Sequence, residues 1–224
     1  MNGGFLFLKK PAGMTSHDVV DKLREISGIK KIGHSGTLDP FAEGLLILGI
    51  GKQFTKKLSL FQKEDKEYLA KIKLGFVSNT FDKTGQIKEV TIKKKPTLKE
   101  VLEILKSFET EFEQVPPLFS AKKIKGKKLY EMARKGFNIK PKPQKVKIYQ
   151  VKLLNYQFPY LTIRVRCSFG TYIRSLANDI GEKLKCGAYL EELLREKIGE
   201  FSLKDAVSLS ELNKRNWKSF LKNV

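Results

Sequence analysis

One short segment of the chain combines residue types that can do chemistry. Residues 33–44 read GHSGTLDPFAEG and hold a histidine, two hydroxyl side chains, two carboxylates and three glycines. The apolar run LLILGI at 45–50 follows at once and predicts a buried strand. Asp39, followed by Pro40, therefore lies in a turn beside the core, where it either caps the turn or is held against a substrate. A fixed carboxylate can act as a nucleophile or stabilise a transient cation.

A second segment carries most of the local charge. The chain has 44 Lys and Arg against 24 Asp and Glu, a formal net charge of +20, which indicates a polyanionic partner. Residues 121–147 contain eleven of these cations and one acid, Glu131, with Tyr130 and Phe137 between them. Such a segment is either solvated surface or an arm that binds phosphate groups, and the scarcity of acids favours the arm. Five of its lysines would grip phosphate: Lys122, Lys123, Lys125, Lys127 and Lys128.

Several classes of protein are not supported by the sequence. No run of about 18 apolar residues exists, and the N-terminus does not read as a signal peptide, so no membrane association is expected. Cys167 and Cys186 form no CxxC pattern, and there are only two histidines, so we expect reduced thiols, no metal and a cytoplasmic protein. The segment 82–85, DKTG, has the letters of the phosphorylated-aspartate motif of ion pumps, but its polar surroundings predict a simple turn.

The periodicity of apolar residues predicts a single α+β domain with a mixed, largely antiparallel sheet flanked by helices. Tyr68 is in phase with Ala70 and Ile72, so its ring should point inward. Thr15 or Ser16 is an expected helix cap, with Thr15 and Asp18 fitting a capping box; Thr97 is a second cap and Gly28 a helix stop. The expected strands are 5–8, 45–50, 68–74, 146–154 and 160–168, and the expected helices are 15–28, 97–108, about 171–184, 188–196 and 210–222.

Four segments together identify a family. Residues 11–20 (PAGMTSHDVV), 33–44, 115–136 (VPPLFSAKKIKGKKLYEMARKG) and 170–181 (GTYIRSLANDIG) resemble the TruB family of tRNA pseudouridine synthases. The resemblance runs over residues 3–203. It implies a pseudouridine-synthase-like catalytic domain, taken here as 1–224, with 121–147 as a basic RNA-gripping insertion. It also implies isomerisation of uridine 55 in the T loop of tRNA, without metal or organic cofactor.

The resemblance assigns Asp39 as the catalytic aspartate and His34 as a residue that contacts RNA where the base is extruded. The target uracil is stacked in a folded loop, so it must be flipped out to reach a carboxylate. Taken alone, His34 would more often be a turn or core residue. Gly33 and Gly36 allow close approach of the backbone, and Pro40 stiffens the turn after Asp39.

The remaining pocket residues implied by the resemblance are Tyr68, Tyr172, Leu193 and Arg174. Tyr68 would lie against the uracil and is a candidate proton acceptor, although a core tyrosine is the simpler interpretation. Arg174 falls in the first turn of its helix, where the helix dipole disfavours a cation by about 0.3–1 kcal/mol. A buried anionic partner would offset this, and the resemblance implies that the partner is Asp39; otherwise Arg174 turns to solvent.

Two features depart from the family. Its usual Leu-Arg-Arg reads Leu193-Leu194-Arg195 here, so one basic contact is missing. Bacterial members usually continue into a C-terminal RNA-binding domain of the PUA type, which we expect to be absent or truncated. Two alternatives remain: a non-catalytic tRNA-binding or remodelling protein, and a guide-RNA-dependent synthase. The family's function makes the T stem-loop of tRNA the expected partner of a monomer.

Overall fold

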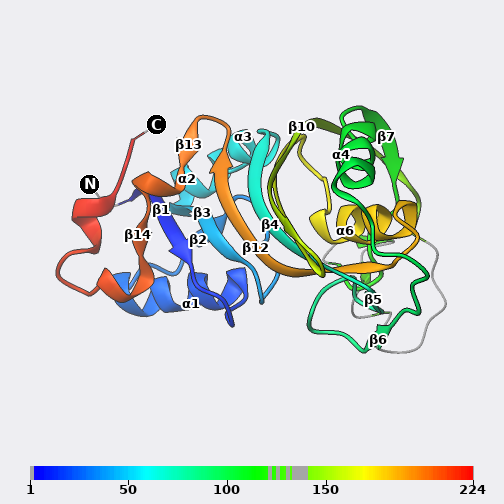
Figure 1. The fold of residues 1–224 in the computed structure, drawn as a ribbon. Helices are drawn as coiled ribbons and strands as arrows, with labels where there is room; N and C mark the ends of the chain where they lie inside the picture. The colour runs from blue at the N-terminus through cyan, green and yellow to red at the C-terminus, as the bar shows by residue number, and fades with distance from the viewer. Residues whose placement is uncertain (1–2, 121–122, 125–126, 130–131, 133–140, 224) are drawn as a thin grey trace. The chain divides into compact units, whose positions relative to one another are not determined.

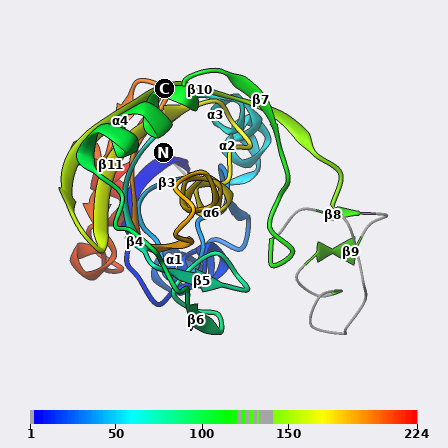
Figure 2. The ribbon, with the colours of Figure 1, turned by 45° about the vertical axis from the view of Figure 1, so that its right-hand side comes forward.

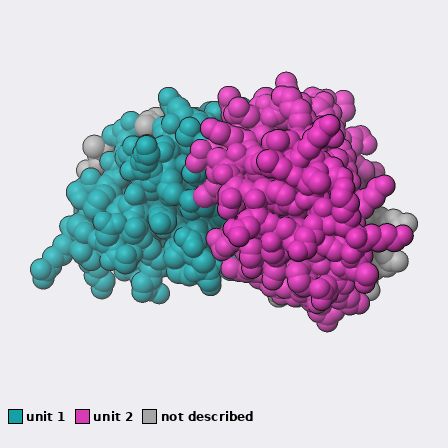
Figure 3. All heavy atoms as spheres, viewed as in Figure 1, with its two compact units in different colours: residues 1–68, 193–224 teal, residues 69–192 magenta. Residues whose placement is uncertain are grey.

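The computed structural model describes residues 3–120, 123–124, 127–129, 132 and 141–223 (Figure 1). The chain forms two compact units, coloured separately in Figure 3. Unit 1 comprises residues 1–68 and 193–224, and unit 2 comprises residues 69–192. Both contain strands and helices, as the predicted α+β class requires. Within the described residues, no helix is long and apolar enough to cross a membrane.

Unit 1 is built on two long antiparallel strands, β1 (Gly4–Lys10) and β3 (Glu43–Ile50). β3 also pairs antiparallel with β2 (Ile32–His34) and parallel with β12 (Ala188–Ile198). Two short strands extend the arrangement: β14 (Val207–Ser208) runs parallel to β1, and β13 (Phe201–Ser202) pairs antiparallel with β12. The loop that joins β2 to β3 carries Asp39.

The strands of unit 1 are buried on both faces, so apolar residues run continuously along them. Leu6 and Leu8 face a core formed with α1 (Ser16–Ser27), whereas Phe5 and Phe7 face a second core. α2 (Lys52–Lys57) and α3 (Ser59–Gln62) cover this second face (Figure 1). α1 begins at a capping box formed by Thr15 and Asp18, and Gly28 ends it with φ of 71°, as predicted.

Unit 2 contains a run of paired strands and two amphipathic helices. Its strands follow the order β4 (Lys66–Leu74), β11 (Tyr160–Cys167), β10 (Gln144–Gln157) and β7 (Glu111–Gln114). The β10–β11 and β10–β7 pairings are antiparallel. α4 (Leu98–Ser107) and α6 (Ile173–Lys183) lie inside the curve of β10 and β11 (Figures 1 and 2). A separate hairpin is formed by β5 (Phe76–Ser78) and β6 (Ile87–Glu89).

Two of the predicted helices are wrong. Residues 188–196 form part of strand β12, because the backbone of Leu194 and Arg195 pairs with β3. Residues 210–222 contain short 3₁₀ turns rather than an α-helix: Leu209–Glu211 and Trp217–Phe220, after a first turn at Leu203–Asp205. Between them, the Asn213 and Asn216 side chains accept hydrogen bonds from nearby backbone N–H groups, which competes with helical bonding.

Candidate active site

The Asp39 loop is clamped to the start of α1. The hydroxyl of Ser16, the first residue of α1, accepts a hydrogen bond from the Leu38 N–H at 2.9 Å. The same hydroxyl donates to the Leu38 carbonyl at 3.3 Å, so one buried side chain satisfies both backbone groups of this residue. Asp39 itself is half-buried. The residue before the proposed nucleophile is therefore fixed by the fold.

Lys10, the last residue of β1, holds the other side of the loop. Its side chain is fully buried, and its ammonium donates to the carbonyls of Pro11 and Met14, both at 2.7 Å, and of Pro40 at 3.4 Å. Burial lowers the pKa of Lys10 from 10.5 to about 8, although the carboxylates of Glu43 and Asp39 act to raise it. Lys10 thus places a positive charge next to Asp39 and restrains the residue that follows it.

Arg195 supports the loop from strand β12. It is 1% exposed, its Nε donates to the Leu45 carbonyl at 2.8 Å, and its guanidinium donates to the Gly36 carbonyl at 3.2 Å. The arginine that remains of the family's pair is therefore internal and bonds to backbone at both ends of the Asp39 loop. Neither Lys10 nor Arg195 was expected from the sequence to support the Asp39 loop, because the loop carbonyls that they bind are distant from them along the chain.

The other predicted residues of unit 1 lie close to buried strands. His34 ends β2, and burial lowers its pKa below 6.5, with Arg195 and His17 acting in the same direction. Its imidazole is therefore neutral at pH 7. Tyr68 in β4 and Leu193 in β12 are each only 8% exposed, which confirms the inward direction predicted for the Tyr68 ring.

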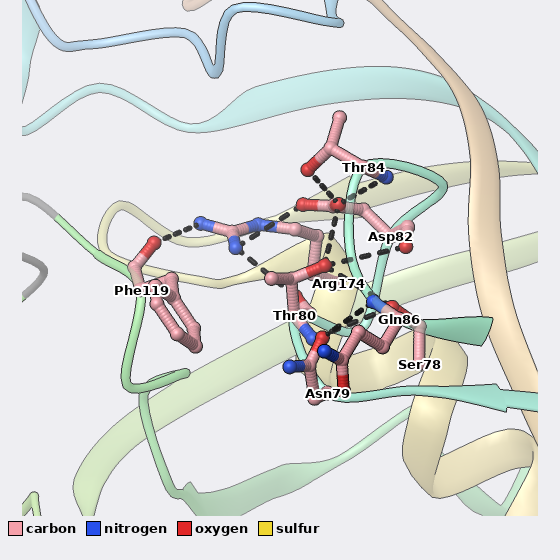
Figure 4. Close-up of polar contacts among 8 residues, drawn as sticks. All are labelled: Ser78, Asn79, Thr80, Asp82, Thr84, Gln86, Phe119 and Arg174. Carbon is pink, nitrogen blue, oxygen red and sulfur yellow. Dashed lines mark hydrogen bonds and ion pairs between the residues drawn. The ribbon is translucent and has the colours of Figure 1, made fainter. Parts of the chain in front are cut away.

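In unit 2, Arg174 is the centre of a polar cluster (Figure 4). It lies in the first turn of α6, is 3% exposed, and its Nη1 is 3.3 Å from Oδ2 of Asp82. Further hydrogen bonds go to the carbonyls of Thr80 at 3.1 Å and Phe119 at 3.0 Å. One buried anion, Asp82, therefore lies beside Arg174. Pairing of Arg174 with Asp39 stays a prediction, because the two residues belong to different units.

Asp82 is a further residue that sequence reasoning missed. The DKTG segment was interpreted as a polar turn, and it is one, but its aspartate is only 3% exposed. The available signal was indirect: an arginine at a helix N-terminus needs a carboxylate, and Asp82 is flanked by hydroxyl side chains that can orient one.

Tyr172 is held through its backbone. It is the N-cap residue of α6, and its N–H donates to Oε1 of Gln114 at 2.8 Å while its carbonyl accepts from Nε2 of the same side chain at 3.0 Å. Gln114 is buried, and the Ser175 hydroxyl donates to the Val115 carbonyl at 2.9 Å. The end of β7 thus fixes the start of α6 and, with it, Arg174.

The basic arm lies mostly outside the described residues. Lys122 and Lys125 are not among them, and for Lys123, Lys127 and Lys128 only the backbone is described, in the paired strands β8 (Lys123–Ile124) and β9 (Lys127–Lys128). Phosphate binding by these lysines stays a prediction. In the described part of the chain, no group of three or more His, Cys, Asp or Glu residues could hold a metal ion.

Two family models match this chain. The family model described as TruB family pseudouridylate synthase, N-terminal domain, matches residues 24–173, and that of the tRNA pseudouridylate synthase B C-terminal domain matches residues 174–223. The tRNA pseudouridine synthase B of Protochlamydia amoebophila is 45% identical over 210 residues, 94% of this chain and 79% of that protein. That of Clostridium tetani is 43% identical over 218 residues, 97% of this chain and 75% of that protein.

Solved structures are similar too. A chain in a Cbf5-Nop10-Gar1 complex matches with a TM-score of 0.72 and 28% identity, over 93% of this chain and 53% of that one. A chain in an H/ACA RNP bound to a substrate RNA containing 2'-deoxyuridine matches with a TM-score of 0.71 and 26% identity, over 96% and 55%. The present chain spans about half the length of these structural relatives. On the family models and the sequence relatives, the chain belongs to the TruB family of pseudouridylate synthases.

Proposed function

We propose that this protein converts uridine 55 in the T loop of tRNA to pseudouridine, with Asp39 as the nucleophile acting on a flipped-out base. The observation that supports this best is the restraint of the Asp39 loop. Ser16, Lys10 and Arg195, all buried, bond to its backbone on both sides of Asp39. A carboxylate fixed before the substrate arrives stabilises developing charge without reorganisation. The relatives named tRNA pseudouridine synthase B support tRNA as the substrate.

The reaction is an isomerisation, so the carboxylate must be regenerated. An oxygen of Asp39 bonds to C1′ of the ribose as the N1–C1′ bond breaks, and the uracil leaves with the electron pair. The freed base turns, its C5 bonds to C1′, and the carboxylate is released. The proton on C5 is then removed, for which we propose Tyr68 as the acceptor, and N1 takes up a proton. No redox partner is needed.

The flipped base needs a pocket that offsets the few kcal/mol lost on unstacking. We propose that Tyr68 lies against the uracil, that Tyr172 and Leu193 contribute pocket walls, and that the neutral His34 contacts RNA where the base left. Arg174, oriented by Asp82, contributes to binding of the RNA substrate. The five lysines of the arm would bind phosphates of the T stem. The protein would act as a cytoplasmic monomer without metal or organic cofactor.

The direct test is incubation with an unmodified tRNA transcript, followed by mapping of pseudouridine at single-nucleotide resolution. We expect modification at uridine 55 alone. Asp39→Asn should retain tRNA binding but lower the single-turnover rate by more than about 10³-fold, as for loss of a nucleophile elsewhere. The matched control is Asp21→Asn, which removes an aspartate half-exposed to solvent on α1.

The outcomes separate the alternatives. A transcript that is bound but never modified would support a tRNA-binding or remodelling protein. Modification that appears only when a guide RNA is added would support a guide-dependent synthase. Turnover by Asp39→Asn at the wild-type rate, in protein free of wild-type enzyme, would remove Asp39 from the mechanism.

A further inference from the structure

The turn between β5 and β6 binds one oxygen of Asp82 and leaves the other for Arg174. Oδ1 accepts three hydrogen bonds, from the Thr80 hydroxyl at 2.7 Å, the Thr84 hydroxyl at 2.6 Å and the Thr84 N–H at 2.9 Å. Oδ2 lies 3.3 Å from Nη1 of Arg174 (Figure 4). Because three donors converge on Oδ1, rotation of the carboxylate would break all of them. The orientation of Oδ2 towards the guanidinium is therefore determined by the turn.

The backbone around Asp82 is held in an uncommon conformation. Phe81 has φ of 61°, in the left-handed region, where a bulky side chain is disfavoured. Such strain persists only where surrounding contacts enforce it. Here those contacts come from β12: the Leu190 N–H donates to the Phe81 carbonyl at 3.0 Å, and the Lys83 N–H donates to the Leu190 carbonyl at 3.1 Å. Phe81 and Lys83, the residues before and after Asp82, are thus both hydrogen-bonded to Leu190.

The inside of the turn is also filled. A Cβ atom at Gly85 would overlap side-chain oxygens of Ser78, Asn79 and Thr80. The Asn79 side chain in turn accepts from the Gln86 N–H at 2.8 Å. These oxygens pack against Gly85, and one of them is the Thr80 hydroxyl that donates to Oδ1 of Asp82.

We propose that Thr84, with Thr80, is a positioning residue for the reaction. Its hydroxyl fixes the Asp82 carboxylate, and Asp82 fixes the guanidinium of Arg174 for RNA binding. Thr80 contributes twice, because its carbonyl also accepts from Arg174 at 3.1 Å. The inference rests on the proposed function, in which Arg174 contributes to substrate binding. A purely local role, in which Thr84 only stabilises the turn, makes a different prediction.

The first experiment compares three hydroxyl variants. Thr84→Val keeps the branched shape and the backbone N–H but removes the hydroxyl, and Thr84→Ser keeps the hydroxyl. Thr97→Val is the matched control, because the Thr97 hydroxyl also donates to a carboxylate, that of Glu100 at 2.7 Å, at the distant N-terminus of α4. Single-turnover rate, RNA affinity and thermal unfolding are measured for each.

We expect Thr84→Val to lower the rate, the RNA affinity or both by about 10-fold or more, the effect of losing a hydrogen bond to a charged group. Thr84→Ser should recover most of the loss. Thr97→Val should lower the unfolding temperature and leave both other readouts unchanged. If Thr84→Val behaves like Thr97→Val, the hydroxyl has only a local structural role and the inference is overturned.

A double-mutant cycle with Asp82→Asn tests whether Thr84 acts through Asp82. If it does, Thr84→Val adds little loss in the Asp82→Asn background. If Thr84→Val lowers the rate or affinity by the same factor with and without Asp82→Asn, the two residues act independently and the inference is overturned. Wild-type activity on tRNA separately decides the proposed function. If that activity is missing, the same cycle is evaluated from RNA affinity alone, with the same two outcomes.

Discussion

At the scale of single residues, buried cations carry much of the organisation of the site. Lys10, Arg174 and Arg195 are 0%, 3% and 1% exposed. A buried charge is costly unless hydrogen bonds satisfy it. Lys10 meets this need with carbonyls on both sides of it, including that of Pro40 in the Asp39 loop. Arg195 bonds to carbonyls at the ends of that loop, and Arg174 to Asp82 and two carbonyls. The cost of burying each cation is thus offset by bonds that fix a loop, and one of these loops carries the proposed nucleophile.

Lys10 leads to a prediction on pH. Its pKa of about 8 in the folded protein lies below the 10.5 of an exposed lysine because burial outweighs the attraction of Glu43, Asp39 and Asp18, while Arg195 lowers it further. Between these values the unfolded chain binds more protons, so this group's contribution to the free energy of unfolding rises with pH. Over the same window the loop loses the positive charge beside Asp39. We predict that the single-turnover rate falls with an apparent pKa of about 8, although this group does not destabilise the fold there.

The control for this prediction is Lys10→Met, which has no ionisable group. Its rate should be lower at pH 7 and should lack the inflection near pH 8. An inflection that survives in Lys10→Met would show that another group, in the enzyme or in the RNA, causes the alkaline decline. Unfolding measured over the same pH range separates loss of activity from loss of fold.

At the scale of elements, the contact between β3 and β12 depends on one glycine. Gly44 has φ of 117° and pairs with Arg195 in parallel register. A Cβ atom at Gly44 would lie 2.5 Å from the Arg195 nitrogen and 2.9 Å from its carbonyl carbon. These are backbone atoms of a strand, so they cannot move aside as a flexible side chain would. The site depends on this contact, because Arg195 supports the Asp39 loop.

We predict that Gly44→Ala lowers the free energy of unfolding by more than about 3 kcal/mol, since both a strained φ and a steric overlap are introduced. Gly28→Ala is the matched control. Gly28 also has positive φ, 71°, but a Cβ there meets nothing within 4 Å, so only about 1–2 kcal/mol of strain is expected. Urea unfolding of both variants measures the difference. If both variants lose the same free energy of unfolding, β3 and β12 can move apart enough to accommodate the Cβ atom, and the steric overlap costs nothing.

Local signals predicted the elements whose determinants are local. The capping boxes of Thr15 and Thr97 and the stop at Gly28 marked the starts of α1 and α4 and the end of α1 correctly. Within α4, Val101 and Leu105 are buried, whereas Leu98 and Leu102 are 53% and 47% exposed. Caps are readable because they depend on residues within one turn of each other.

Elements and contacts that depend on residues distant along the chain could not be predicted from the sequence. Strand β12 has the sequence AYLEELLREKI, whose leucines, glutamates and lysine favour helix, but pairing with β3 overrides that preference. The Arg195–Leu45 hydrogen bond spans 150 residues, and the Arg174–Thr80 bond spans 94. Asp82 was overlooked for the same reason: its burial and its partner on α6 depend on tertiary structure. Asp39 could be proposed from the sequence because the surrounding segment is distinctive in itself.

At the scale of the whole molecule, the net charge of +20 predicts RNA binding that weakens strongly with salt. Replacement of Lys122, Lys123, Lys125, Lys127 and Lys128 by alanine should reduce the slope of log K against log salt. Each lost phosphate contact should lower it by about 0.9 on duplex RNA treated like B-DNA, or about 0.7 on single strands. The measurement is the tRNA dissociation constant at several salt concentrations.

A second variant with five lysines replaced by alanine matches the loss of charge. Its five replaced lysines are exposed residues in or near α4: Lys93, Lys94, Lys95, Lys99 and Lys106. If the lysines act only through general electrostatic attraction, both variants should show the same decrease in slope. If the arm contacts phosphate directly, only the arm variant should show a lower slope. An unchanged slope in the arm variant would show that the arm is solvated surface.

The extent of the RNA contact can be predicted from the size of the binding surface. A typical specific nucleic-acid interface buries on the order of 1,000–2,500 Å² of protein surface, which is enough for a stem and its loop. The residues to which we assign RNA contacts are a pocket for one base and an arm for stem phosphates. No assigned contact requires the anticodon arm or the acceptor end.

We therefore predict that an isolated T stem-loop is modified at a rate comparable to that of full-length tRNA. The pocket and the phosphate contacts in the adjoining stem offset the energetic cost of flipping the uridine, and the fragment can make both sets of contacts. Single-turnover and steady-state kinetics on both RNAs at the same ionic strength provide the comparison, with a stem-loop in which the target uridine is replaced by cytidine as the control for background. If the fragment is barely modified while full-length tRNA turns over, essential contacts lie elsewhere on the tRNA. A deficit confined to KM would place those contacts in binding, whereas a deficit in the single-turnover rate at saturating RNA would mean that they help to expose the base.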